Sequence, residues 1–323
     1  MLPSPSRLTS LFRPADRVAT VNLYLHRFAL FTAFSTLCLI IAGALVTSNE
    51  AGLSVPDWPL SYGQWMPPMI GGVFYEHAHR MIASFVGLLT IVLAVWLWKA
   101  ETRGWIKKLG LAAIGAVIAQ GVLGGLTVIF LLPVAISVSH ACLAQLFFCM
   151  IVSLAWFTSP SWHKQHKELG PRLPDQGTPS LRALCLTANI AVFLQLLMGA
   201  ALRHKGLDII HHLCGALVVA VLLVWILSRV VTEYTGRPEI LRWALLLNGM
   251  VMLQLVLGAG TYWVREITET AAQPLLLMVL LTVAHVATGA LILAVSVILS
   301  IQVHARPGHS TADMGNQGVP AAT

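Results

Sequence analysis

Eight separate runs of about 20 apolar residues constrain this chain more than any other feature. A helix of about that length spans the hydrocarbon core of a lipid bilayer. Only 10% of the residues are charged, whereas soluble domains carry about a quarter. The sequence therefore predicts an all-α integral membrane protein with eight transmembrane helices, at residues 28–47, 77–98, 109–131, 137–157, 181–202, 209–228, 241–263 and 276–301.

Basic residues are distributed unequally between the two sides of this predicted bundle. Of the 20 Lys and Arg residues, only Arg80, Arg203, Lys205 and Arg265 fall on the side of connection 48–75, which leaves 16 for the opposite side. Because cytoplasmic connections are enriched in Lys and Arg, both termini are predicted to be cytoplasmic. The same asymmetry explains the net charge of +7, so no nucleic-acid partner is expected.

The longest cytoplasmic connection, residues 158–180, contains four prolines and divides the chain into two halves. The N-terminal half covers residues 28–157 and the C-terminal half covers residues 181–301. A basic cytoplasmic segment, 1–27, precedes them. The small, polar tail at 302–323 is predicted to be a disordered cytoplasmic segment.

A histidine pattern recurs once in each predicted helical hairpin. In each hairpin the second helix carries a histidine with a small residue four positions later: His79 and Ala83, His140 and Ala144, His212 and Ala216, His285 and Gly289. The first helix of three hairpins carries a glutamine four positions before a glycine: Gln120 and Gly124, Gln195 and Gly199, Gln254 and Gly258. Leu39 and Gly43 take these places in the first hairpin. The pattern predicts two pseudo-repeated four-helix bundles with one similar site in each.

Ionisable side chains inside membrane spans usually have a function. Zinc and non-haem iron sites cluster histidines with carboxylates, and no acidic residue lies near His140 or His212. Opposed helices of a bundle can instead present imidazoles to both faces of one porphyrin. The pattern therefore predicts two bis-histidine haem sites toward the outer leaflet, His79 with His140 and His212 with His285. Histidines outside the repeat register are interpreted as bystanders: His77, His204 and His211.

The two predicted sites differ in their surroundings. Glu76 precedes His79 by three residues, on the same helical face, and the outer connection 48–75 is predicted to cover something beneath it. A carboxylate there could stabilise a cationic intermediate or move protons. Arg80 could bind a haem propionate or lie at the interface as a snorkelling arginine. This difference predicts one reactive haem and one auxiliary haem.

Several of these segments resemble the haem A synthase family over nearly the whole chain, about residues 28–301. The resemblance is carried by Ala42-Gly43-Ala44-Leu45-Val46-Thr47, by Gly52-Leu53-Ser54 with Pro56-Asp57-Trp58-Pro59, by Glu76-His77-Ala78-His79-Arg80, and by His140, His212 and His285. Some family members carry a cysteine pair in the first outer loop, and here those neighbourhoods read Ser54-Val55 and Ser61. A thiol mechanism in this loop therefore cannot apply to this chain.

The resemblance implies an oxidoreductase that acts on a CH group, oxidising the C8 methyl of haem O to a formyl group and so supplying haem A for cytochrome oxidase. It implies that Glu76, His79 and His140 receive haem O, with Glu76 as the catalytic residue, and that His212 and His285 hold a haem b cofactor. Arg80 and Asp57 are candidates for propionate or other supporting contacts. The resemblance further implies a multi-pass protein of the bacterial inner membrane. A haem O synthase, an electron acceptor, membrane lipid and a second copy of the chain are candidate partners.

Two other readings remain open. A plain electron-transfer cytochrome b accounts for the histidines but leaves Glu76 and the outer loop unexplained. A transporter that uses histidines as a proton relay would bind no haem.

Overall fold

A computed structural model describes residues 21–167, 175, 177–271 and 274–305. Apart from one isolated bridge between Ser61 and Gln64, the regular secondary structure of these residues is helical. Eight helices are long and apolar enough to cross a membrane, which confirms the predicted fold class. The eight are α1 (Leu23–Ser48), α2 (Gly72–Ala100), α3 (Gly104–Ile129), α4 (Val134–Phe157), α6 (Leu181–Arg203), α7 (Ile209–Glu233), α8 (Pro238–Ile267) and α9 (Leu276–His304).

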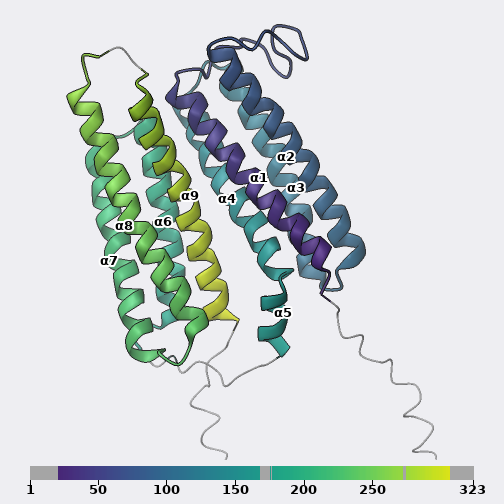
Figure 1. The fold of residues 1–323 in the computed structure, drawn as a ribbon, viewed down its shortest axis with the longest axis vertical. Helices are drawn as coiled ribbons and strands as arrows, with labels where there is room; N and C mark the ends of the chain where they lie inside the picture. The colour runs from purple at the N-terminus through teal and green to yellow at the C-terminus, as the bar shows by residue number, and fades with distance from the viewer. Residues whose placement is uncertain (1–20, 168–174, 176, 272–273, 306–323) are drawn as a thin grey trace, which may run out of the picture.

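The helices form two groups that lie side by side (Figure 1). In the first group α1 packs against α2, α2 against α3, α3 against α4, and α4 returns to α1. In the second group α6, α7, α8 and α9 contact one another in the same cyclic order. Each group is thus a ring of four helices in which the first and third, and the second and fourth, are diagonal partners.

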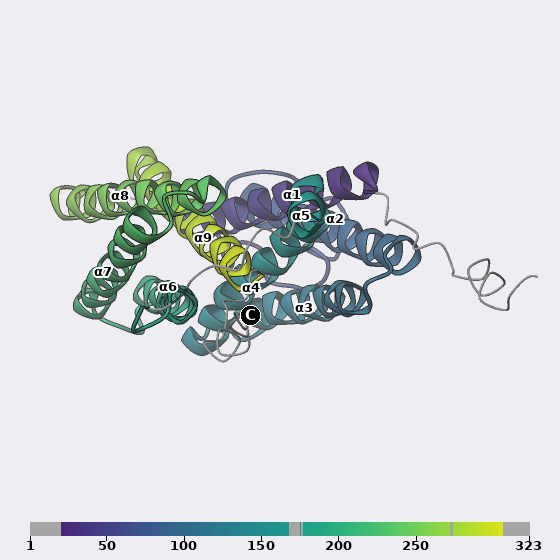
Figure 2. The same cartoon turned by 90° about the horizontal axis from the view of Figure 1, so that it is seen from below.

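The two rings share a seam made by α1, α4, α6 and α9. The end-on view places α9 between α8 and the first group (Figure 2), and α9 contacts both α1 and α4. Ile40 from α1 and Phe148 and Cys149 from α4 belong to the buried cluster that forms the core of the second ring. This shared core crosses the division that was expected between residues 28–157 and 181–301. The internal repeat and the domain boundaries stay predictions.

Several helices begin earlier or end later than the apolar runs predicted. The side chain of Asn22 accepts a hydrogen bond from the backbone N–H of Leu25 and caps α1 five residues before the expected start. A short helix, α5 (Pro160–Lys167), occupies part of the predicted linker. At the other end α9 continues to His304, so the start of the predicted tail is helical, while residues 306–323 lie outside the described part.

The outward faces of the spans are apolar. Between 17% and 39% of the residues in the most apolar window of each span are buried inside the protein. Large side chains such as Phe34, Leu88 and Val256 remain exposed. Exposed apolar area of this extent is unfavourable in water, so these faces need an apolar surrounding such as lipid. The chain is a multi-pass membrane protein.

Candidate functional site

The four repeat histidines lie near the same end of the molecule, on diagonal partners within each ring. His79 and His140 lie about two turns into α2 and α4, and His212 and His285 lie in α7 and α9. All four lie toward the end of their helix that is on the side of the outer loop. His285 is deeper than His212, because α9 begins nine residues before it.

Each of these four imidazoles packs against a glycine of the preceding helix. A Cβ atom added to Gly43 or Gly124 would come within 3.1 Å of Cε1 of His79 or His140. At Gly199 and Gly258 the corresponding distance to Cε1 of His212 or His285 is 3.0 Å. Real Cβ atoms rarely approach so closely, so a side chain at these positions would displace the imidazole. Space for each imidazole is therefore left by a glycine on the preceding helix, in addition to the small residue four positions after the histidine.

His212 and His285 face each other across the second ring. Their ring centroids are 6.2 Å apart and the ring planes are inclined at 67°. A metal that binds an imidazole nitrogen on each side at about 2.0–2.1 Å needs centroids roughly 6 Å apart. The spacing fits two axial ligands of a single ion.

His79 and His140 form the corresponding pair in the first ring and lie within electrostatic range of each other. The Nδ1 atoms of His79, His140 and His285 are buried and make no hydrogen bond of standard geometry among the described residues. The backbone groups of Leu39, Gln120 and Gln254 lie near these three imidazoles at a poorer geometry. A buried polar atom without a partner is costly. Such atoms are expected where a ligand completes the site.

The surroundings of these pairs favour a planar macrocycle over a small metal site. No group of three or more His, Cys, Asp or Glu side chains in the described ranges could hold a metal ion. Each four-helix ring contains two imidazoles with a glycine beside each, and two imidazoles match the two axial ligands of a haem. The residues fit a haem in each ring.

Glutamines contact three of the four histidines. Gln120 and Gln195 donate from Nε2 to the backbone carbonyls of His140 and His212, both at 2.9 Å. Nε2 of Gln254 lies 3.2 Å from Nε2 of His285. The first hairpin has an apolar residue, Leu39, in this register, so His79 has no such amide partner.

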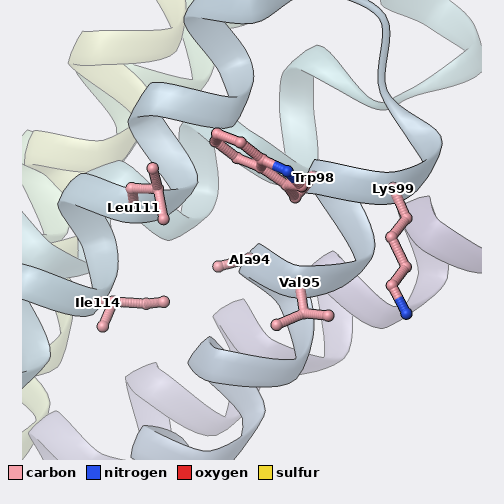
Figure 3. A pocket seen from close by; sticks show the side chains of 6 residues that line it. All are labelled: Ala94, Val95, Trp98, Lys99, Leu111 and Ile114. Carbon is pink, nitrogen blue, oxygen red and sulfur yellow. The ribbon is translucent and has the colours of Figure 1, made fainter.

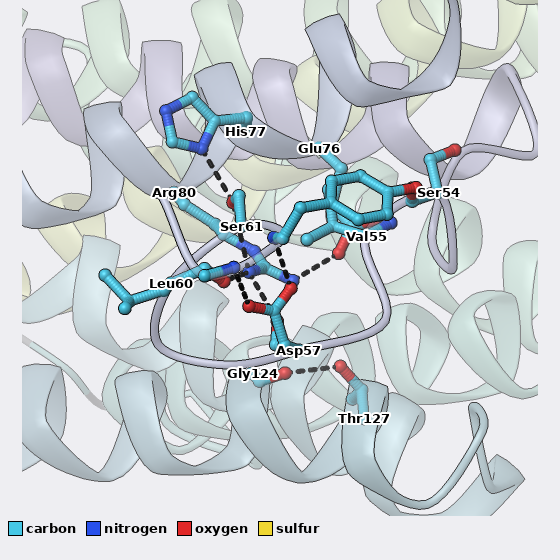
Figure 4. A network of polar contacts seen from close by, with 12 residues as sticks. Ser54, Val55, Asp57, Leu60, Ser61, Glu76, His77, Arg80, Gly124 and Thr127 are labelled. Carbon is cyan, nitrogen blue, oxygen red and sulfur yellow. Dashed lines mark hydrogen bonds and ion pairs between the residues drawn. The ribbon is translucent and has the colours of Figure 1, made fainter. Parts of the chain in front are cut away.

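The outer loop is fastened to α2 by Glu76 and Arg80 (Figure 4). The carboxylate of Glu76, which is only 4% exposed, accepts from the backbone N–H of Val55 at 2.9 Å and from Arg80 at 2.6 Å. Arg80 also donates to the carbonyls of Asp57 and Leu60, each at 2.7 Å. Both residues thus bind the loop, and their predicted roles toward haem stay predictions.

His77 takes part in the same attachment. It is buried, and its Nδ1 lies 2.8 Å from the hydroxyl of Ser61 (Figure 4). The interpretation of His77 as an interfacial bystander is therefore wrong, although it is not one of the paired histidines. Arg80 follows Glu76 by four residues and His77 by three, and this spacing was the signal that could have revealed the role of His77.

Trp58 joins the loop to α3. Its indole ring lies so close to Gly125 that an added Cβ atom would come within 2.6 Å of the ring. Gly125 follows Gly124, which rests against His140, so the indole lies beside the first histidine pair. Gly125 thus receives a loop side chain, whereas an added Cβ at Gly121 would meet nothing within 4 Å.

The side chain of Asp57 organises the loop itself. Its carboxylate accepts from the backbone N–H groups of Tyr62 and Gly63, at 2.6 Å and 2.8 Å. Tyr62 and Gly63 both have positive φ values, as the turn between Ser61 and Gln64 requires. The bond from Gly63 is the main cause that lowers the pKa of Asp57 below its ordinary value.

The remaining histidines and a surface hollow lie apart from the paired rings. His204 follows the end of α6 and is within electrostatic range of His140, whereas His211 is exposed. An apolar hollow lined by Ala94, Trp98 and Leu111 lies between α2 and α3 (Figure 3). It is at the opposite end of α2 from His79 and therefore does not belong to the histidine sites.

The sequence profile of the COX15-CtaA family, described as cytochrome oxidase assembly protein, matches residues 70–211. Over this stretch, a little under half of its length, the chain is similar to this family. This confirms the resemblance inferred from the motifs. The matched stretch includes Glu76, His79, Arg80 and His140 and ends one residue before His212.

Curated proteins that are similar to this chain carry the name haem A synthase. One from Alkalihalophilus pseudofirmus is 35% identical over 107 residues, which cover 32% of this chain and 36% of the relative. One from Halalkalibacterium halodurans is 33% identical over 132 residues, 40% of this chain and 42% of the relative. One from Symbiobacterium thermophilum is 26% identical over 242 residues, 65% of this chain and 78% of the relative. This chain spans about two-fifths of the length of the first two relatives.

Proposed function

We propose that this protein is a haem A synthase, which oxidises the C8 methyl of haem O to a formyl group and so supplies haem A for cytochrome oxidase. The observation that carries the proposal is the difference between two otherwise similar histidine pairs. Among the described residues, the first pair alone lies beside a loop that is fastened by a buried carboxylate. The name of the relatives supports the same activity.

The first ring is proposed to receive the substrate. His79 and His140 would bind the iron of haem O from opposite faces, and Gly43 and Gly124 leave room for their rings. The loop would exclude water, because Trp58 packs against Gly125 on one side and Val55 bonds to Glu76 on the other. A low-dielectric site of this kind strengthens electrostatic effects on the reacting group.

Glu76 is proposed to act on the charge that develops beside the macrocycle as the methyl group loses electrons. Both carboxylate oxygens accept hydrogen bonds, one from Val55 and one from Arg80. Their positions are therefore fixed, which suits a preorganised electrostatic group. A residue that carries protons between sites needs freedom to turn, so these contacts favour the electrostatic role over proton transfer.

The second ring is proposed to hold a resident haem b between His212 and His285. When bound, such a haem supplies one-electron transfer. Gln195 and Gln254 would orient the two imidazoles through their amide groups. No carboxylate lies between these two histidines in the part of the chain that the structure describes, which is consistent with a cofactor that stays chemically unchanged.

The protein is proposed to lie in the bacterial inner membrane with both termini in the cytoplasm. The Lys and Arg asymmetry supports this orientation. The histidine pairs would then lie toward the outer leaflet. Haem O synthase, as the source of the substrate, and an electron acceptor are proposed partners.

The proposal can be tested by haem extraction. The protein is purified in detergent from cells that also make haem O, and the extracted haems are separated by chromatography. We expect haem b together with haem O, a hydroxylated derivative or haem A. In the Glu76→Gln variant we expect both haems to remain bound while conversion stops.

Two outcomes would contradict the proposal. Haem b alone, in two equivalents and unaffected by haem O supply, would favour an electron-transfer cytochrome. A protein without haem would favour a transporter. His211→Ala is a suitable control, because His211 is exposed and lies beside a proposed ligand without facing its partner.

A further inference from the structure

Two arginines at the outer mouth of the second ring form no ion pair among the described residues, although Glu266 and Glu269 lie close to one of them in the sequence. Arg203 ends α6 and Arg265 lies in the last turn of α8. The two guanidinium groups are within electrostatic range and repel each other. No ion pair joins either of them to a carboxylate among the described residues. Paired like charges in a membrane protein are costly and indicate a function.

Helix periodicity places both arginines above the histidine pair. Arg203 follows Gly199 by four residues and Arg265 follows Gly258 by seven, so each lies on the face of its helix that carries the glycine. With a rise of about 1.5 Å per residue, the two positions are roughly 6 Å and 10 Å farther out than those glycines. Since Gly199 and Gly258 rest against His212 and His285, both cations lie above the same site.

The neighbouring groups leave this pair available for an anion. Arg203 donates to the hydroxyl of Ser48 at 2.9 Å, a neutral partner that does not compensate its charge. Burial, followed by the charge of Arg203, lowers the pKa of His204. His204 is therefore largely neutral at pH 7, and the positive charge of this turn comes from Arg203 and the exposed Lys205, with Arg265 within electrostatic range.

The first ring has no equivalent. The positions four and seven residues beyond Gly43 are Thr47 and Glu50, and those beyond Gly124 are Val128 and Leu131. Arg80, which lies beside His79 in α2, already binds Glu76 and two loop carbonyls. The two rings thus differ in their capacity to hold an anion above the histidines.

We propose that Arg203 and Arg265 form a carboxylate-binding site that anchors the propionate groups of the haem held by His212 and His285. This inference rests on the proposed function. Guanidinium groups bind carboxylates through paired, charge-assisted hydrogen bonds. The anchor retains the resident haem in the second ring, whereas the first ring, without such cations, can release its haem as a product.

A titration with haem b and its dimethyl ester tests the site. The full-length chain carrying His79→Ala and His140→Ala is prepared without haem in detergent, and binding at the second ring is followed by absorbance. We expect haem b to bind about 10-fold or more tightly than the ester, because a hydrogen bond to a charged group contributes about that factor. In the Arg203→Gln/Arg265→Gln variant the two affinities should become equal, with ester binding unchanged.

Two control variants address folding and general charge. Ser48→Ala removes the hydrogen bond of Arg203 but keeps both cations, and Lys205→Gln removes an exposed charge from the same turn. Both should keep the preference for the free acid. If the double arginine variant still prefers haem b over its ester, the inference is wrong. The inference is also wrong if this preference survives and the variant loses co-purifying anionic lipid, because the arginines would then bind lipid and not the propionates. Failure to bind either form would overturn the proposed haem site together with it.

Discussion

The indole ring of Trp58 lies directly over Gly125, one residue from the glycine that supports the His140 ring. A loop residue and a proposed iron ligand therefore pack against consecutive positions of α3. This relationship joins the outer loop to the first histidine pair without any cysteine. Glu76, His77 and Arg80 fasten the same loop to α2.

Gly125→Ala should loosen the loop. The new Cβ would meet the rigid indole ring within 2.6 Å, so Trp58 must move away. We expect faster amide hydrogen exchange in residues 52–64. Gly121→Ala is the matched control, because its Cβ meets nothing within 4 Å and alanine favours the helix by up to about 1 kcal/mol. Equal exchange in the two variants would contradict the packing role of Trp58.

Arg80→Gln should destabilise the protein strongly. It leaves the buried Glu76 carboxylate without its ion-pair partner and frees two loop carbonyls. Breaking one side of a buried pair costs about 3–5 kcal/mol. Thermal unfolding of the purified protein measures the loss. The double variant Glu76→Gln/Arg80→Gln should recover part of it, and a double variant as unstable as the sum of both single variants would argue against direct coupling.

Gly258→Ala should weaken haem binding in the second ring. The added methyl group would press against Cε1 of His285 at 3.0 Å, and overpacking of this kind costs about 1–3 kcal/mol. Haem content after purification, measured from the absorbance spectrum, should fall. Gly249→Ala in the same helix has open space around it and should leave the content unchanged.

Gln254→Leu should raise the reduction potential of the haem proposed to lie beside His285. An imidazole that binds iron through one nitrogen carries a proton on the other, so it would donate to the oxygen of the nearby Gln254 amide. This bond makes the imidazole a stronger electron donor to iron, and its loss weakens that donation. A hydrogen bond of ordinary strength corresponds to about 20–60 mV in a one-electron couple. Redox titration measures the change. Gln302→Leu, at a buried position near the other end of α9, is the control and should leave the potential in place.

The loop should open at acidic pH through Asp57. Because the N–H groups of Gly63 and Tyr62 lower its pKa in the folded protein, the carboxylate stabilises the turn above the ordinary pKa of about 4. This contribution is lost as the pH falls through the lowered value. Hydrogen exchange in residues 57–64 should therefore show constant protection from neutral pH down to about 4 and lose it below. Asp57→Asn should weaken protection at neutral pH and remove this dependence.

Sequence periodicity was sufficient to predict the eight spans and the four histidines, because apolar length and a one-per-hairpin pattern are local signals. The glycines behind the rings were also visible in the sequence, but their contact with the histidines depends on how adjacent helices face each other. The loop attachment was not predictable in this way. Val55 contributes only its backbone N–H and Ser61 only a hydroxyl, and neither residue type indicates its partner 16–21 residues away.

The participation of Ile40, Phe148 and Cys149 in the core of the second ring affects how the chain can be divided. A C-terminal fragment made alone would present an uncovered apolar strip where α1 and α4 belong. The complementary N-terminal fragment would present the matching strip. Two fragments produced from a chain cut within residues 158–180 should therefore find each other in the membrane and purify as one complex, with the covalent connection dispensable once they have met.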